Sequence, residues 1–369
     1  MEYTDRGDGF LRQVAQNFLP FRDDVLVPGQ TIRDMGLREG IEIQGLAREG
    51  GGRRTLVEVQ KAGGLDPAEA KNLPHFQDLV SVNPHEAFQL AAEQAEISLR
   101  VIDLIAPIGR GQRGLIVSPP KAGKTTLLEH LGQAIAKRHP ETHLMLLLID
   151  ERPEEVTHFR RAVRAEVLAS SADSAADSHI KVARIAMERA KRLVESGRHV
   201  VILLDSLTRL GRASNREQGP GGRTMSGGVD NRALLFPRQF FGAARNCEGS
   251  GSLTILATAL VDTGSRMDEV IFQEFKGTGN MELILDRAIA DRRIFPAVDV
   301  LKSGTRREEL LCPPEELKQR HLLRRALADL SPIEAAQFLI EKLNKTPSNQ
   351  AFLQSLGSAA AAAGVRRFR

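Results

Sequence analysis

The residues most able to do chemistry form a phosphate-binding loop in the first half of the chain. Residues 118–125 read SPPKAGKT and fit the pattern G-x-x-x-x-G-K-[ST], except that Ser118 replaces the first glycine. Gly123 lets the backbone curl toward phosphate oxygens, Lys124 reaches the β- and γ-phosphates, and Thr125 offers a hydroxyl to Mg²⁺. A strand-like run before the loop and an amphipathic helix after it make a chance match the weaker explanation. The sequence therefore predicts a site for ATP and Mg²⁺.

Acidic side chains follow the next two apolar runs. Glu151 comes just after the run 144–149, and Asp205 comes directly after the run 200–204. Ligands of open parallel sheets bind at the carboxyl ends of strands, so Asp205 is placed to hold Mg²⁺ and Glu151 to act as general base toward water. Either acid taken alone is equally well explained as a helix cap or turn residue. A phosphate loop in the same domain favours the catalytic interpretation for both.

The segments that must position these residues alternate between buried strands and amphipathic helices. One helix is expected at Thr125–Arg138, and strand-length apolar runs lie at 115–117, 144–149, 200–204 and 253–261. This alternation predicts an α/β domain whose parallel sheet has helices on both faces. Short β-type runs separated by glycine predict a small all-β barrel before it. The expected organisation is a barrel at 1–62, a connector at 63–100 with a helical patch at 87–95, a core at 101–345 with C-terminal helices, and a C-terminal helix and mobile basic tail at 346–369.

Composition narrows the class of protein. A length of 369 residues suggests two or three domains at about 150 residues each. The longest apolar run has six residues, whereas a membrane span needs about 20, and the first residues lack the apolar core of a secretory signal. Two cysteines, and nine histidines that form no Cys/His cluster, argue against a disulfide scaffold or a zinc site. We therefore expect a cytoplasmic protein without a membrane partner.

Other candidates for nucleotide binding are less specific. The turn 109–114 has glycines and arginines that could line the pocket, but a plain basic turn explains it equally well. Phe295 could stack on adenine, although a buried phenylalanine is the commoner case. An arginine supplied across a subunit boundary would stabilise the transition state, and composition does not choose among Arg152, Arg293 and Arg306.

Three glycine-rich loops carry cations and hydroxyls, at 219–228, 263–267 and 275–280. Such loops can follow a nucleic-acid backbone without recognising its sequence. Solubility alone explains any one of them, but three on a nucleotide-binding core favour a functional interpretation.

Several of these stretches resemble the Rho family of bacterial transcription termination factors. The resemblance covers about residues 7–345 and rests on the motifs PIGRGQRGLIV at 107–117, LIDERPEEV at 148–156, FFGAARN at 240–246, DTGSRMDEV at 262–270, EFKGTGN at 274–280 and SGTR at 303–306. It implies a homohexameric ring of RecA-like ATPase cores that hold ATP between subunits. It also implies that single-stranded RNA is pulled through the ring, with RNA polymerase and elongation factors as partners.

The resemblance also assigns roles to residues of the core. It implies Lys124, Glu151 and Arg306 as the catalytic lysine, carboxylate and arginine finger, Thr125 and Asp205 as the metal site, and Arg152 as a nucleotide sensor. The implied nucleotide-binding set is Gly109, Arg110, Gly111, Gln112, Arg113, Gly114, Lys121, Ala122, Gly123, Lys124, Thr125, Thr126, Arg152 and Phe295.

The implied RNA-binding residues belong to two pore loops and to the barrel. The pore loops supply Arg223, Thr224, Ser226, Gly227, Gly264, Ser265 and Arg266, with Arg223 and Arg266 standing where the family often has lysine. The barrel, of cold-shock or OB type, supplies Gly7, Asp8, Gly9, Phe10, Leu11, Arg12, Asp24, Val25, Leu26 and Arg53.

The barrel departs from the family at two stacking positions. Asp8 and Leu26 stand where the family has aromatic side chains that stack on pyrimidine bases. Losing a stacked base removes about 1–3 kcal/mol, and Asp8 also repels phosphate. We therefore expect weak or altered loading of RNA on this domain.

Two other functions remain as alternatives. A rotary or secretion-type ring ATPase shares the 109–114 stretch, but would be expected to have glycine at position 118 and no nucleic-acid strand in its barrel. A non-enzymatic RNA-binding scaffold would not need Lys124, Glu151, Asp205 and Arg306 together.

Overall fold

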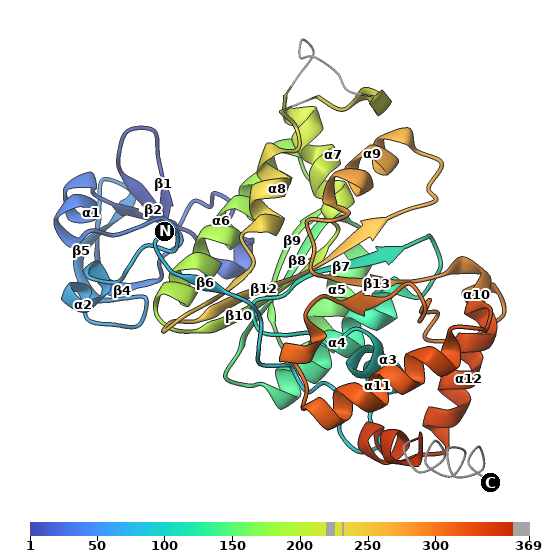
Figure 1. Cartoon of the computed structure of the whole chain (residues 1–369). Coiled ribbons are helices and arrows are strands. Elements are labelled where there is room, and N and C mark those ends of the chain that lie inside the picture. Colours follow the sequence, from blue (N-terminus) through green and yellow to red (C-terminus); the bar gives the residue numbers. More distant parts are fainter. Residues whose placement is uncertain (219–225, 231, 357–369) are drawn as a thin grey trace, which may run out of the picture.

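A computed structural model describes residues 1–218, 226–230 and 232–356 (Figure 1). The chain folds into a small β domain at its N-terminus and a larger α/β domain. The α/β core preceded by a small β domain, as predicted, is confirmed.

The N-terminal domain is a five-stranded sheet in the order β1-β2-β3-β5-β4. Its strands pair antiparallel except for β3 with β5. The side chains of Val27, Ile32, Leu56 and Val59 fill its core. Its elements are β1 (Glu2–Tyr3), β2 (Gly9–Leu11), η1 (Val14–Gln16), β3 (Val25–Val27), α1 (Gly29–Met35), β4 (Ile43–Gly50), β5 (Arg53–Ala62) and, just after the sheet, α2 (Pro67–Lys71).

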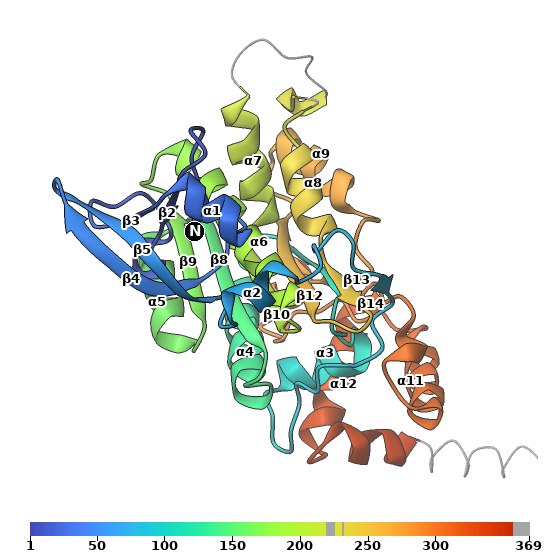
Figure 2. The same ribbon diagram turned by 90° about the vertical axis from the view of Figure 1, so that its left-hand side faces the viewer.

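The β domain rests against helix α6 (Ala176–Glu195) of the larger domain (Figure 1). Arg38 lies 3.2 Å from Glu195, and Arg189 lies 3.2 Å from Glu42. The β4–β5 ribbon extends away from this contact (Figure 2). The two domains are therefore joined through ion pairs as well as through the chain.

The larger domain is built on a nine-stranded sheet with the main order β14-β13-β7-β12-β10-β8-β9. The five strands from β13 to β8, together with β9, run parallel, whereas β14 is antiparallel at one edge. The strands are β6 (Ser81–Val82), β7 (Arg113–Ser118), β8 (His143–Glu151), β9 (Glu166–Ser171), β10 (His199–Asp205), β11 (Arg245–Cys247), β12 (Ser252–Leu260), β13 (Met281–Ile284) and β14 (Gly304–Thr305).

Helices cover both faces of this sheet, because alternate residues of each strand point to opposite sides. In β8, Leu144, Leu146 and Leu148 join the core under α3 and α4, whereas Met145 and Leu147 join the core under α6 and α7. The helices are α3 (Ile97–Ile105), α4 (Lys124–Arg138), α5 (Pro153–Ala162), α7 (Leu207–Glu217), η2 (Ser226–Gly228), α8 (Leu235–Gly242), α9 (Arg266–Phe275), α10 (Arg287–Asp291), η3 (Glu308–Leu310), α11 (Pro314–Leu327) and α12 (Pro332–Asn344). Within the described ranges, every helix is too short or too polar to traverse a lipid bilayer.

The helical patch expected at 87–95 is wrong. This segment is an extended strap in which Phe88 and Leu90 are buried and Gln89 between them is exposed. Phe88 N–H donates to the carbonyl of Ile108, and the first helix of the domain begins only at Ile97. An alternating buried pattern therefore outweighs the helical propensity of the alanines.

Candidate active site

The phosphate loop connects β7 to α4, as its sequence predicts. Lys124 is the first residue of α4, and Gly123 before it has φ of +90°, a conformation that side-chain-bearing residues rarely adopt. The first N–H groups of the helix have no partner within the helix and favour an anion. The loop therefore presents its backbone as a cradle for phosphate.

Three charged side chains meet directly behind this loop. The Lys124 Nζ lies 2.6 Å from Asp205 Oδ1 and 3.3 Å from Glu151 Oε1. Glu151 ends β8 and Asp205 ends the neighbouring strand β10, and both are almost fully buried. Parallel pairing places the two carboxyl ends at the same edge of the sheet, so the structure brings together the three residues that the sequence analysis placed there.

Burial gives these groups unusual proton affinities. The pKa of Glu151 is raised to about 7, mainly by burial and next by the Asp205 carboxylate, while Lys124 and Arg209 oppose these two effects. Burial alone would lower the pKa of Lys124, but Asp205 and Glu151 together raise it above its ordinary value. A glutamate with a pKa near 7 suits general base chemistry at neutral pH.

The residues predicted to hold Mg²⁺ fit that ion. Asp205 Oδ1 accepts hydrogen bonds from Lys124 and from Thr258 Oγ1, the latter at 2.7 Å. Asp205 Oδ2 is buried and makes no hydrogen bond. Thr125 follows Lys124 in the first turn of α4. One hydroxyl and one carboxylate are a common protein contribution to Mg²⁺, which keeps several waters and takes oxygens from phosphates.

A cavity of about 600 Å³ opens beside the phosphate loop. Phe295 is 47% exposed, so it is not the buried residue that the simpler interpretation expects. A side chain at Gly123 would contact its ring, which places the ring next to the loop. The cavity is lined by Glu96, Ile97, Ser98, Lys121, Ala122, Gly123, Thr126, Leu127, His130, Leu285, Phe295, Pro296 and Ala297. A mostly apolar slot with an exposed aromatic ring, adjoining a phosphate cradle, suits a nucleobase.

Residues 109–114 lie at the amino end of β7, opposite the end that carries the phosphate loop of the same chain. Gly111 N donates to Thr254 Oγ1, and Gln112 Nε2 donates to Asn280 Oδ1 at 2.6 Å. Arg110 pairs with Glu86 and Glu141. The six residues of β7 separate Gln112 from the start of the phosphate loop by about 20 Å at roughly 3.3 Å per residue.

Two of the arginine candidates occupy different ends of the same sheet. Arg152 is exposed and precedes α5 at the carboxyl edge, next to Glu151. Arg306 is exposed just after β14, and its N–H donates to the carbonyl of Asn280 at the amino edge. The sheet therefore keeps Arg306 away from Lys124 and Glu151 of its own chain.

Helix α7 carries residues that the sequence analysis missed. Arg209 donates to the carbonyl of Asp150 and lies 3.2 Å from Glu151. One turn on, Arg212 forms two hydrogen bonds to Asp268 in the first turn of α9. After a further turn, Asn215 bonds the carbonyl of Gly228 and the N–H of Asp230. The spacing of three residues, which is typical of one face of a helix, is the signal that the sequence offers for them.

The two predicted pore loops adjoin each other. A side chain at Gly227 would lie 2.9 Å from the carbonyl oxygen of Arg266, and the space around Gly264 is open. Ser265 caps α9, which begins at Arg266. Arg223 and Thr224 lie outside the described residues, and of Ser226 only the backbone is described.

The predicted RNA-binding side chains of the β domain are largely paired with each other. Phe10 lies under Arg12 and Arg53, with its ring centroid 4.9 and 5.8 Å from their guanidinium carbons. Arg12 lies 2.5 Å from both Glu2 and Asp24. Asp8 Oδ1 accepts a hydrogen bond from Gly29 N, and Leu26 pairs with Phe10 across β2 and β3. Gly7, Gly9, Leu11 and Val25 lie on or beside the same two strands.

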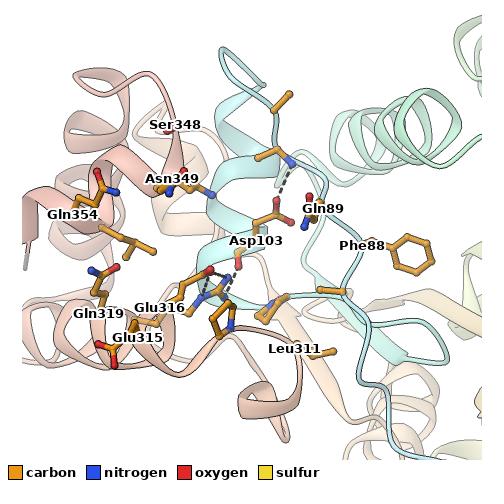
Figure 3. A pocket seen from close by; sticks show the side chains of 18 of the residues that line it. Phe88, Gln89, Asp103, Leu311, Glu315, Glu316, Gln319, Ser348, Asn349 and Gln354 are labelled. Carbon is orange, nitrogen blue, oxygen red and sulfur yellow. Dashed lines mark hydrogen bonds and ion pairs between the residues drawn. The ribbon is translucent and has the colours of Figure 1, made fainter.

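A second cavity, of about 690 Å³, lies far from these residues, between the strap at 87–93 and the C-terminal helices (Figure 3). Its described lining combines apolar residues with acids and amides such as Glu315, Glu316 and Gln319. Arg320 donates to Glu316 and to the carbonyls of Asp103 and Leu104. Burial raises the pKa of Asp103 in its wall to about 7. This chemistry does not suit a phosphate.

Comparisons with known proteins agree with the two-domain arrangement. Residues 98–305 match the model of the ATP synthase alpha/beta family, nucleotide-binding domain. Residues 1–68 match the model of the Rho termination factor, RNA-binding domain. The matches fall on the α/β domain and the β domain described above.

Near full-length relatives carry one name. The transcription termination factor Rho of Aquifex aeolicus is 51% identical over 365 residues, covering 97% of this chain and 84% of that protein. The protein of the same name from Streptosporangium roseum is 53% identical, covering 94% and 89%. That from Pseudomonas aeruginosa is 50% identical, covering 96% and 86%.

A solved structure shares the fold at low identity. It is described as a prototypical ATPase from the type III secretion system of pathogenic bacteria. It has a TM-score of 0.61 and 21% identity, covering 76% of this chain and 86% of that one. At this identity the likeness supports the RecA-like fold alone.

Proposed function

Because this chain belongs to the Rho family of transcription termination factors, we propose that it ends transcription as an RNA-dependent ATPase. It does so in the cytoplasm as a ring of six identical copies that pulls single-stranded RNA away from RNA polymerase and its elongation factors. One observation carries the proposal: Lys124, Glu151 and Asp205 meet at one edge of the sheet, and Arg306 is exposed at the other. A full set of charges around ATP then forms only where two copies meet.

Hydrolysis follows from the positions of the side chains. On binding ATP, Lys124 turns from the two carboxylates to the β- and γ-phosphates. Glu151 then accepts a proton from the water whose oxygen attacks the γ-phosphorus, as the bond to the β–γ bridging oxygen breaks. Thr125 and Asp205 would hold Mg²⁺, which would neutralise charge on the phosphate oxygens. Arg306 of an adjacent copy stabilises the charge of the transition state, and Arg152 senses the nucleotide.

The nucleobase occupies the cavity beside the loop. Lys121, Ala122 and Gly123 border the phosphates, and the base stacks on Phe295 with Thr126 at the side of the slot. Support for this arrangement comes from the continuity of the cavity with the phosphate loop. ATP rather than free phosphate is therefore the ligand that fills it.

RNA contacts two parts of each copy. Inside the ring, two neighbouring glycine-rich loops, at 219–228 and 263–267, hold the RNA backbone as it moves. The residues that make these contacts are Arg223, Thr224, Ser226, Gly227, Gly264, Ser265 and Arg266. On the β domain, Phe10 with Arg12 and Arg53 offers one aromatic face bordered by cations. Because Asp8 and Leu26 offer no ring, this outer surface binds weakly and with little preference for pyrimidines.

The decisive experiment measures steady-state ATP hydrolysis of the full chain with and without poly(C) or another single-stranded RNA. We expect RNA to stimulate the wild type. Glu151→Gln should lower the stimulated rate by about 10²–10⁴-fold while leaving ADP binding intact, since only the proton acceptor is lost. Glu154→Gln, an exposed change of the same kind in the next helix, should leave the rate unchanged.

The outcomes separate the candidate functions. Hydrolysis that no RNA stimulates would favour the rotary or secretion-type ATPase. Undetectable hydrolysis with RNA present would favour a non-enzymatic scaffold. A full rate in Glu151→Gln would show that another group accepts the proton.

The weak outer surface has its own test. Leu26→Tyr restores an aromatic ring opposite Phe10 and should tighten binding of a short pyrimidine RNA about tenfold, within the range of one stacked base. Fluorescence anisotropy with the full chain measures this, with Val80→Tyr, at a 60% exposed position outside the β domain, as the control. Tight pyrimidine-selective binding by the wild type would contradict the proposal.

A further inference from the structure

We propose that His130 sets the purine preference of the nucleotide site by fixing the direction of the Ser98 hydroxyl. The inference rests on the proposed function, because it takes the cavity beside the phosphate loop as the nucleobase pocket. It assigns the recognition of adenine to a pair of side chains on two helices.

The pair belongs to the lining of the same cavity as Phe295. Ser98 is in the first turn of α3 and is 7% exposed, whereas His130 is on α4 and half-buried. Ser98 Oγ and His130 Nδ1 are 2.7 Å apart, and both residues line the cavity. Thr126 and Leu127, one turn before His130, continue the same wall. The hydroxyl is therefore held at the pocket by a contact between residues 32 positions apart.

The direction of this hydrogen bond decides what Ser98 offers to a base. A serine hydroxyl has one proton to donate and two lone pairs to accept with. When His130 Nδ1 accepts that proton, only the lone pairs of Ser98 Oγ remain for the ligand. The pocket then presents an acceptor, which matches the exocyclic amino group of adenine and repels the carbonyl oxygen of guanine.

His130 acts as a positioning residue in this scheme. Without the imidazole, the hydroxyl is free to rotate and can donate to the guanine carbonyl. A site that aims one polar group at its ligand rejects analogues with mismatched hydrogen bonding, because that group is otherwise left unpaired. Loss of His130 should therefore relax the choice of base rather than abolish binding.

The test is a fluorescence titration of the full chain with N-methylanthraniloyl-ADP and N-methylanthraniloyl-GDP. The fluorophore is on the ribose and leaves the base edge unchanged. We expect the wild type to prefer the adenine nucleotide, and His130→Ala to reduce that preference about tenfold, mainly through tighter binding of the guanine nucleotide. Ser98→Ala should reduce the preference by a similar factor.

Further variants separate positioning from a structural role. Because His130 acts through Ser98, the double variant Ser98→Ala/His130→Ala should show the preference of Ser98→Ala alone. His130→Asn, whose amide oxygen can accept the same proton, should retain most of the preference. His158→Ala, at a histidine of α5 that pairs with Glu129, is the matched control and should change nothing.

Each result has one meaning. An unchanged preference in His130→Ala, or additive effects in the double variant, would overturn the inference while leaving the ATPase proposal intact. A wild type that binds neither nucleotide would overturn both. A wild type that prefers the guanine nucleotide would show that Ser98 donates, contrary to the direction proposed here.

Discussion

The two edges of the large sheet use charge in opposite ways. At the carboxyl edge, Lys124 is balanced by two buried carboxylates within 3.3 Å. At the amino edge, burial lowers the pKa of Arg113, and the neighbouring Arg245 and Arg306 lower it further. At the carboxyl edge the charge of Lys124 is therefore neutralised, whereas at the amino edge three arginines lie close together.

This difference in charge suits the association of copies that we propose. The guanidinium group of Arg113 donates hydrogen bonds to the carbonyls of Thr278 and Ala244, whereas Arg306 is exposed. An edge rich in cations complements an edge that holds a polyanion, so copies should join head to tail. Such contacts form rings when the rotation closes.

The largest effect is expected when one residue of each edge is substituted in a different copy of the chain. Arg306→Ala should lower RNA-stimulated hydrolysis by about 10³-fold or more, the usual worth of an arginine finger. Mixing it with Glu151→Gln should restore activity, because one copy supplies the carboxylate and the next the arginine. In a random one-to-one mixture about a quarter of the sites are complete, as head-to-tail contact requires.

Arg287→Ala, an exposed change on α10, serves as the control for this experiment and should keep full activity. If the mixture of the two variants did not recover RNA-stimulated hydrolysis, Arg306 would act within its own chain. The proposed pairing of the two edges between copies would then be wrong.

An intermediate effect is expected in the turn at the amino edge. Gly111 has φ of +90°, and an added Cβ would lie 2.2 Å from Asn246 N. Gly111→Ala should therefore reduce the free energy of unfolding by about 3 kcal/mol, measured by urea denaturation. Affinity of the folded fraction for ADP should not change, because the turn is remote from the phosphate loop.

Gly50→Ala, where an added Cβ meets nothing within 4 Å, is the matched control and should be nearly neutral. If Gly111→Ala lost affinity for ADP without losing stability, the turn would be part of the nucleotide site.

The smallest effect concerns protonation at the carboxyl edge. Glu151 has a pKa of about 7 and must be ionised to accept a proton. The value of kcat/KM should therefore be halved near pH 7 and fall about tenfold per unit below it. An RNA-stimulated rate that stays flat from pH 5.5 to 8 would exclude Glu151 as the titrating base.

Much of the carboxyl edge follows from sequence because local signals determine it. Local patterns predict that Lys124, Glu151 and Asp205 lie together: apolar runs of strand length, a phosphate loop, and acids at the ends of strands. The rest depends on contacts between distant segments. Arg209 reaches Glu151 from another helix, and Ser98 reaches His130 across 32 positions. Sequence position also does not show that the turn at 109–112, close to the phosphate loop along the chain, lies a full strand away from it in space.

Helix α7 connects the candidate ATP site to the two loops that we propose bind RNA. In turn, Arg209 contacts Glu151, Arg212 contacts Asp268 in the first turn of α9, and Asn215 contacts Gly228 at the end of the other glycine-rich loop. A rigid rod fastened at three points cannot tilt at one without moving the others. If both loops bind RNA, they move only when the ATP site of the same copy changes state. Hydrolysis of ATP in the absence of RNA is then disfavoured.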